Sequence, residues 1–214
     1  IAQDDFTGAL DIVWGTDTRT EAEIVAAADA VGRSGMKRMV TGDDAAGSMA
    51  VNGVQLIRAL IWSAEEGGLQ FKAKVKISAI TNVQVFIGLT DTLSLEAPFT
   101  LAAGNVLTSN ASDALGFLFD TSADNDTIWL VGVDSNVDAT KQNSALAFVA
   151  DTYREFRIDV TAAGVASFYI DGTLIGTVMA AAVSPDVLST PFVGGFARAA
   201  ASRNIYTDYV MVKH

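Results

Sequence analysis

Residues 153–178 read YREFRIDVTAAGVASFYIDGTLIGTV and predict three consecutive antiparallel strands. Every second residue from Phe156 to Val160 is apolar, which is the period-two pattern of a strand with one buried face. A TAAG turn follows, and the next strand, 165–170, is rich in aromatic and β-branched residues. Asp171-Gly172 supplies the positive φ angles of a tight hairpin turn before the strand 173–178. Such a meander needs a second sheet to cover its apolar face.

Length and composition favour a β domain with a substantial core. The chain has 214 residues, of which 50% are hydrophobic and 18% are charged. Its formal net charge is −11, so nucleic acid and anionic lipid are not expected as main partners. Because no apolar run reaches the roughly 18 residues that span a bilayer and no charged-then-apolar leader opens the chain, we expect no membrane association.

Cysteine and histidine usage narrows the chemistry further. The chain has no cysteine, which excludes disulfides, thiol nucleophiles and thiolate metal sites and fits assembly in a bacterial cytoplasm. The one histidine is the last residue, His214, where a frayed end is expected. We therefore predict no cofactor, no metal site and no histidine-based catalysis.

Outside the meander, the pattern predicts further short strands and one sandwich domain. In LQFKAKVKI, residues 69–77, apolar and polar side chains alternate, whereas 54–62 is apolar on both faces. About a dozen short strands with turns near ten-residue spacing, and no recurring helix pattern, are typical of an antiparallel sandwich. We predict a single domain over 1–214, with the remaining strands at 36–40, 83–90, 116–119, 127–133, 192–199 and 205–212, and loops at 41–53 and 134–147. Residues 91–112 are weakly patterned, with Pro98 as a breaker.

The N-terminal region is less clearly patterned. Residues 1–20 are typical of an extended arm that Trp14 anchors to the sandwich. For 20–32, Thr20 and Glu23 have the spacing of a helix capping box, but Ser34-Gly35 could instead close a hairpin between 24–28 and the strand 36–40. We favour the strand, since everything downstream is β.

Three pieces of the sequence resemble the concanavalin A-like jelly roll shared by lectins, laminin-G modules and laminarinase-type glycosidases. They are LQFKAKVKI at 69–77, FYIDGTLIG at 168–176 and TDYVMV at 207–212. The resemblance implies an all-β fold, an antiparallel two-sheet jelly-roll sandwich. It says little about activity, because this fold hosts many unrelated functions.

A longer succession of motifs is similar to structural proteins of tailed bacteriophages. It includes TGDDAAG at 41–47, GLTD at 88–91, GFLFD at 116–120 and WLVGV at 129–133. The likeness implies a non-enzymatic virion structural protein, a capsid decoration or cement protein on the outside of the head. Its partners would then be the major capsid protein and copies of itself. The alternatives are a carbohydrate-binding adhesion module of a tail or fibre and, more distantly, a degenerate glycoside hydrolase.

The sequence lacks the carboxylate pattern of a jelly-roll glycosidase. Laminarinase-type relatives carry two Glu flanking an Asp on one strand, and a retaining mechanism needs its two carboxyls about 5–5.5 Å apart. Among the six glutamates here, Glu21 and Glu23 alternate without an Asp between them, and adjacent Glu65 and Glu66 would point to opposite faces. We therefore expect no enzymatic activity.

Two groups of residues could form a ligand site, and each also has a structural interpretation. Asp120, Asp124, Asn125 and Asp126 could offer oxygens to Ca²⁺, but a solvated acidic turn is favoured because turns use Asp and Asn freely. Aromatic residues that could stack on a sugar are expected in the core instead, because each lies in an apolar strand; they are Trp62, Trp129 and Tyr169.

The candidate interface is a lysine stripe on the polar face of 69–77. Lys72, Lys74 and Lys76 stand out on so acidic a chain. Cross-strand pairing with acids such as Glu155 or Asp159 is the structural interpretation, and docking on an acidic capsid surface is the functional one. The two strands that are apolar on both faces, 54–62 and 127–133, are a second place to seek a subunit interface.

Overall fold

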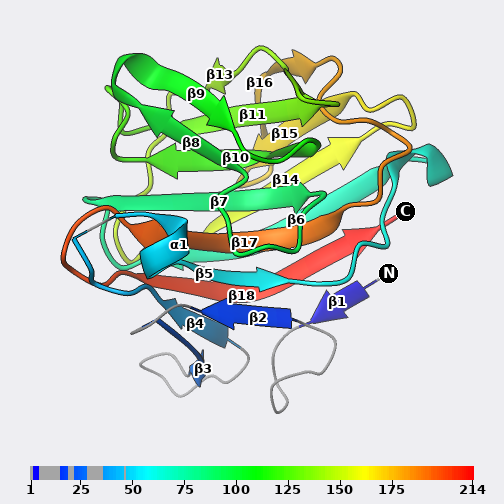
Figure 1. Cartoon of the computed structure of the whole chain (residues 1–214). Helices are drawn as coiled ribbons and strands as arrows, with labels where there is room; N and C mark the ends of the chain where they lie inside the picture. Colours follow the sequence, from blue (N-terminus) through cyan, green and yellow to red (C-terminus); the bar gives the residue numbers. More distant parts are fainter. Residues whose placement is uncertain (1, 5–14, 19–21, 28–35, 46) are drawn as a thin grey trace.

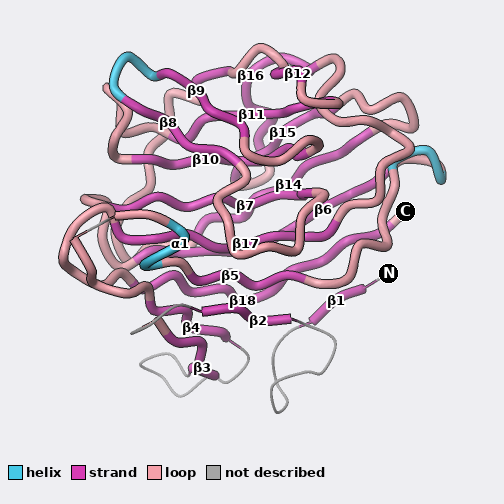
Figure 2. The backbone as a smooth tube through the Cα atoms, in the orientation of Figure 1, coloured by secondary structure: helices cyan, strands magenta, loops and turns pink. Residues whose placement is uncertain are grey.

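The computed structural model describes residues 2–4, 15–18, 22–27, 36–45 and 47–214. These residues form two eight-stranded antiparallel sheets, sheet A and sheet B, and a separate two-stranded hairpin (Figure 1). Helix in the described residues is limited to α1 (Met49–Asn52) and two 3₁₀ turns, η1 (Ala64–Glu66) and η2 (Ala103–Asn105), as Figure 2 shows. The predicted antiparallel two-sheet jelly-roll sandwich is confirmed.

Sheet A contains the predicted meander and has the order β16-β15-β14-β6-β18-β4-β3, with β1 also paired to β18. Asp171 and Gly172 adopt φ angles of 51° and 79°, so the hairpin turn between β15 and β16 is as predicted. The strands of sheet A are β1 (Ala2–Asp4), β3 (Glu23–Ala27), β4 (Met36–Val40), β6 (Leu69–Ile77), β14 (Arg154–Val160), β15 (Ala166–Ile170), β16 (Thr173–Met179) and β18 (Asn204–Lys213).

Sheet B faces sheet A across the core and has the order β12-β11-β10-β7-β17-β5-β2, with β13 also paired to β11. Its strands are β2 (Gly15–Thr18), β5 (Val54–Ile57), β7 (Val83–Thr90), β10 (Ala114–Asp120), β11 (Ile128–Asp134), β12 (Val137–Asp138), β13 (Gln142–Asn143) and β17 (Thr190–Ala197).

The main hydrophobic core lies between the two sheets and is built from the inward half of each alternating strand. Phe117 of β10 stands at its centre, with ring centroids 5.0 Å from Phe156 and 5.4 Å from Phe168. Tilted and edge-to-face arrangements at these distances are favourable for aromatic rings. The predicted meander therefore packs directly onto the central strands of sheet B.

A second hydrophobic cluster covers the outer face of sheet B, the face turned away from sheet A. It is closed over by the hairpin β8 (Phe99–Ala102) and β9 (Val106–Ser109) and by α1, which lie in front of sheet B in Figure 1. The Phe86 ring of β7 lies 5.5 Å from Phe99 and 5.6 Å from Phe192 of β17. The chain thus fills this face of sheet B with its own side chains.

The structure corrects several of the predictions. The loop predicted at 41–53 contains α1, and the loop predicted at 134–147 contains the short strands β12 and β13, while the weakly patterned 91–112 contains the β8–β9 hairpin. Residues 54–57 and 128–133 are buried on both faces within the chain, so these parts of the two apolar strands predicted at 54–62 and 127–133 do not offer a subunit interface, whereas Ile61 is 52% exposed. The first of them also ends early, at Ile57, because the Thr190 side chain accepts the Arg58 N–H and donates to the Arg58 carbonyl, at 2.8 Å each.

At the N-terminus, the described residues support the strand interpretation. β3 pairs antiparallel with β4, from Glu23 opposite Val40 to Ala27 opposite Met36. Short pieces of the predicted arm join both sheets, β1 beside β18 and β2 beside β5. Trp14, Glu21 and residues 28–35 lie outside the described residues.

Candidate functional site

The outer face of sheet A carries every tyrosine of the chain. Tyr153, Tyr169, Tyr206 and Tyr209 are all half-buried, whereas the ten phenylalanines that the structure describes are all buried. Because a tyrosine hydroxyl prefers water or a polar partner, this division places the polar aromatic rings on one accessible surface. We call this surface, with the charged side chains between the rings, the tyrosine face.

The predicted lysine stripe lies in the tyrosine face. Residues of β6 alternate between buried and half-buried, so Lys72, Lys74 and Lys76 point outward as predicted. The Lys76 ammonium lies 4.5 Å from the ring centroid of Tyr206 and 5.2 Å from that of Tyr153. At these distances the cation is attracted by the negative face of the ring.

The partners of the lysines differ from the acids proposed for them. Lys74 forms an ion pair of 2.7 Å with Asp208, although Glu155 lies opposite it in register. A bulge between Thr207 and Tyr209 in β18 brings Asp208 within reach. Glu155 instead accepts a hydrogen bond from the Tyr209 hydroxyl.

This environment changes the pKa of the Tyr209 hydroxyl. Burial raises its pKa, and the hydrogen bond to Glu155 and the negative charges of Glu155 and Asp208 raise it further. The phenol therefore stays neutral and keeps donating its hydrogen bond at alkaline pH. This contact links β18 to β14 across the intervening strand β6.

The described strands of sheet B do not present the carboxylates of a glycosidase. On the outer face of β10, alternate positions hold Gly116, Leu118 and Asp120, and Leu118 belongs to the buried second cluster. Glu65 and Glu66 are exposed in η1. In the described part of the chain, no strand combines two Glu and an Asp at alternate positions.

In the acidic segment 120–126, the predicted solvated turn is present at Asp124, Asn125 and Asp126, which are exposed, whereas Asp120 differs from it. Asp120 has no exposed surface, and its carboxylate pairs with the Arg198 guanidinium and accepts the backbone N–H groups of Leu101 (2.9 Å) and Ser122 (3.0 Å). Asp124 accepts the Gly104 N–H at 2.9 Å. Within the described residues no group of three His, Asp or Glu side chains could hold a metal ion.

The aromatic residues weighed as sugar platforms divide between core and surface. Trp62 and Trp129 are 7% and 8% exposed, so the expected core role holds for both, whereas Tyr169 is half-buried in the tyrosine face. His214 is not a frayed end: its ring centroid lies 5.1 Å from that of Trp62, and its Nδ1 lies 3.2 Å from the Gly68 carbonyl oxygen.

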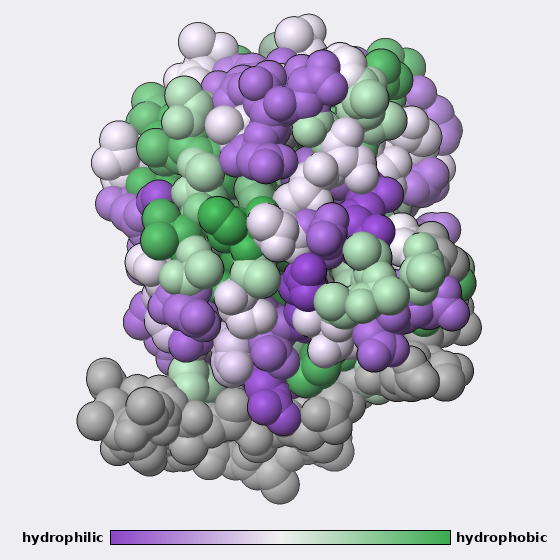
Figure 3. All heavy atoms as spheres, turned by 90° about the vertical axis from the view of Figure 1, so that its left-hand side faces the viewer, coloured by the Kyte–Doolittle hydropathy of each residue, from purple (hydrophilic) through white to green (hydrophobic). Residues whose placement is uncertain are grey.

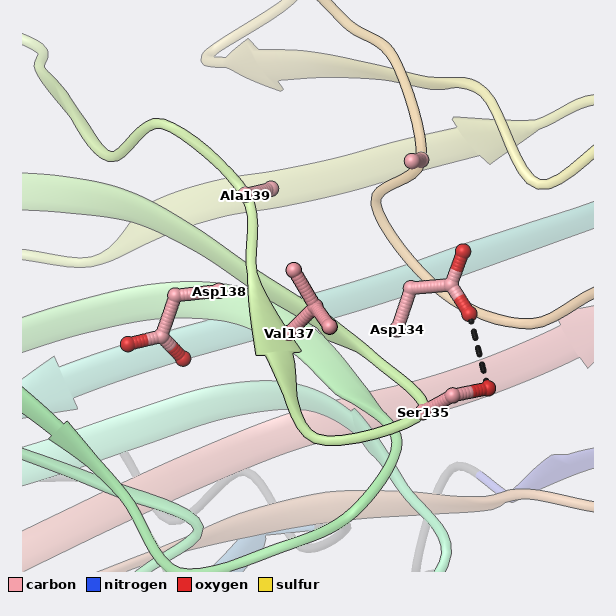
Figure 4. A pocket seen from close by; sticks show the side chains of 6 residues that line it. Asp134, Ser135, Val137, Asp138 and Ala139 are labelled. Carbon is pink, nitrogen blue, oxygen red and sulfur yellow. Dashed lines mark hydrogen bonds between the residues drawn. The ribbon is translucent and has the colours of Figure 1, made fainter.

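A second surface feature borders the edge of sheet B around 134–142. Shallow pockets of about 370, 460 and 360 Å³ adjoin this segment, and Figure 4 shows the first, between Asp134, Ser135 and Val137. In the described chain, exposed valines stand around them: Val106, Val137 and Val178, at 57%, 69% and 56% exposure. We call these three side chains the valine rim.

Figure 3 shows the end of the sandwich that lies on the left in Figure 1. Hydrophobic and hydrophilic residues are interspersed on it.

Comparisons with known proteins support the fold. No protein-family model and no curated protein matches the sequence. Among solved structures, the chain is similar to a Bacillus licheniformis β-glucanase, with a TM-score of 0.68, 11% identity and coverage of 100% of this chain and 97% of the other. It is also similar to the carbohydrate recognition domain of Emp47p, with a TM-score of 0.63, 10% identity and coverage of 98% and 92%.

A third similar structure is the Bacteroides ovatus mixed linkage glucan GH16 protein in complex with a G4G4G3G product. Its TM-score is 0.65 at 10% identity, with coverage of 99% of both chains. The chain therefore has the concanavalin A-like jelly-roll fold. These likenesses, at low identity, concern the fold alone, and the resemblance to bacteriophage structural proteins stays a prediction.

The sequence pointed to part of the tyrosine face. The sequence indicates the lysine stripe and offers Tyr169 as an aromatic candidate, but no motif in it marks Tyr153, Tyr206 and Tyr209 as site residues. One signal could have found them. The chain has eleven phenylalanines and only four tyrosines, so a tyrosine in a predicted strand indicates a ring whose hydroxyl faces water or a polar partner.

No helix in the described residues is long and apolar enough to cross a membrane.

Proposed function

We propose that the protein is a non-enzymatic binding module that holds a carbohydrate on the tyrosine face of sheet A. The observation that carries the proposal is the gathering of all four tyrosines, half-buried, among charged side chains on one sheet face. The apolar face of a sugar ring packs against an aromatic ring, and its hydroxyls pair with charged and amide groups beside it. Both kinds of partner alternate across this face.

The covered outer face of sheet B and its paired carboxylate support the proposal that the protein is not an enzyme. The outer face of sheet B is occupied by the β8–β9 hairpin and α1, and its fully buried carboxylate, Asp120, is committed to Arg198. A carboxylate held by an arginine and two backbone N–H groups has little freedom to act as a nucleophile or an acid. The carbohydrate names of the similar structures agree with a glycan ligand.

A glycan array with purified protein tests the proposal. We expect specific binding of wild type and at least about tenfold weaker binding of the double variant Tyr169→Ala, Tyr206→Ala, because each stacking ring contributes on the order of 1 kcal/mol. Leu188→Ala, which changes an exposed apolar side chain outside the face, serves as the control. Absence of binding to every glycan, or equal binding by the double variant, would contradict the proposal.

We also propose a second function: the protein is a virion component, a head decoration or cement protein. The valine rim supports it, since exposed apolar side chains beside a sheet edge are suited to protein contacts. Binding to an assembled shell better than to its free subunits would stabilise the shell by mass action. Copy number per purified particle tests it: hundreds of copies fit decoration of the head, a handful fit a tail part, and none contradicts it.

A further inference from the structure

Two positive side chains lie directly opposite each other in the tyrosine face. Lys72 of β6 is in register with Arg157 of β14, and both are half-buried and point outward. Like charges at directly opposite positions of a sheet are destabilising. A pair of this kind on a chain of net charge −11 is unexpected if stability alone selected the residues.

The Arg157 side chain is held by an aromatic ring and one acid, and its Nε makes no hydrogen bond. Its guanidinium carbon lies 3.6 Å from the ring centroid of Tyr169, so the planar group stacks on the ring. It forms an ion pair with Asp159, with Nε and Oδ2 3.4 Å apart, and its buried Nε makes no hydrogen bond. A stacked guanidinium with unused N–H groups is prepared for an external planar acceptor such as a carboxylate.

A third cation completes the group. Lys213 of β18 lies opposite Gln70, the next outward position of β6 beyond Lys72. The acid beside them, Asp159, is already engaged by Gln70 at 2.8 Å. Within the described part of the chain, neither Lys72 nor Lys213 has an ion pair or hydrogen bond from its ammonium group. We call Lys72, Arg157 and Lys213 the cation cluster.

We propose that the cation cluster binds the carboxylate of an acidic sugar, a uronic acid residue, and thereby selects acidic over neutral glycans. This inference rests on the proposed carbohydrate-binding function and names the ligand class of the same face. The carboxylate pairs with Arg157 and Lys72, and the sugar ring lies beside Tyr169. The ligand then neutralises the like charges that the free protein holds together.

The experiment measures affinity by titration calorimetry for an oligouronate and for its carboxyl-reduced, neutral counterpart of the same length. We expect wild type to bind the uronate at least about tenfold more tightly, and the double variant Lys72→Gln, Arg157→Gln to lose most of that difference, because charged hydrogen bonds are among the stronger ones. Affinity for the uronate should also fall as salt is raised, because the pairing is exposed. Lys141→Gln, a lysine above Trp129 and outside sheet A, is the matched control.

The outcomes separate the two proposals. Equal affinity for the neutral and acidic oligomers, both weakened by Tyr169→Ala, overturns the acidic-sugar inference and leaves the proposed function intact. Binding of neither oligomer, with no hit on the glycan array, removes both. A sulfated oligomer of the same length that binds more tightly than the uronate overturns carboxylate selectivity.

A stability measurement provides a readout that needs no ligand. If Lys72 is held opposite Arg157 for binding, Lys72→Gln should raise the melting temperature of the free protein or leave it unchanged. Added oligouronate should raise the melting temperature of wild type and not that of the double variant. A lower melting temperature for Lys72→Gln would show that the lysine serves the fold, and would overturn the inference.

Discussion

The Asp120 carboxylate at the end of β10 is bound by the Arg198 guanidinium, which follows the end of β17. Asp120 is fully buried, and the guanidinium also lies 4.7 Å from the Phe196 ring centroid. The same carboxylate accepts the Leu101 N–H of β8. This contact therefore joins the covering hairpin to the two strands beneath it.

Asp120→Ala should destabilise the protein by about 3–5 kcal/mol, because it leaves the arginine and a buried backbone N–H without their partner. Urea unfolding gives the free energy directly. Asp126→Ala, in the exposed part of the same segment, should change it by no more than about 0.5 kcal/mol. A cost below about 1 kcal/mol for Asp120→Ala would contradict the structural role.

Phe117→Ala should cost about 3–5 kcal/mol, because it removes the ring that Phe156 and Phe168 pack against and leaves a cavity between the sheets. Thermal and urea unfolding measure the loss, and Val137→Ala in the valine rim is the surface control. If both variants lose the same stability, the core does not lie between these strands as described.

Gln142→Ala should promote self-association. The Gln142 carboxamide accepts the Thr177 N–H at 2.7 Å and donates to the Thr177 carbonyl at 3.1 Å, as a neighbouring strand would. β16 is an edge strand without charged residues, and Leu174 and Val178 are exposed on it. An unpaired edge of this kind is a template for pairing with another chain. Sedimentation of Gln142→Ala and of the control Thr140→Ala tests this, and identical monomer fractions would refute it.

Tyr209→Phe should lower stability most below pH 10 and progressively less at higher pH. The pKa of Tyr209 is raised in the folded protein above its ordinary value of about 10, so the unfolded state loses its phenol proton first. The contribution of Tyr209 is thus fully present below pH 10 and is lost as the pH rises from there towards the folded pKa. The difference in unfolding free energy between wild type and Tyr209→Phe should shrink over that interval. Tyr206→Phe is the control, and a difference constant with pH would count against the Glu155 contact.

Local patterns were sufficient for much of the fold. The alternation in 69–77, the meander after Tyr153 and the Asp171-Gly172 turn all depend on residues close together in sequence, and each is present as predicted. The strand predicted over 54–62 ends at Ile57, because the Thr190 side chain pairs with Arg58. That residue is 132 positions away along the chain from Arg58, so no local pattern could reveal it.

By itself the sequence determined the class of fold and the outward direction of Lys72, Lys74 and Lys76, because side-chain alternation along a strand is a local property. The tertiary structure alone decided which charges meet. Lys72 lies opposite Arg157 because β6 pairs with β14, and Tyr206 and Tyr209, three positions apart, share a face because a bulge separates them. Register between distant strands depends on packing across the whole sandwich, so the composition of the tyrosine face follows from the folded chain.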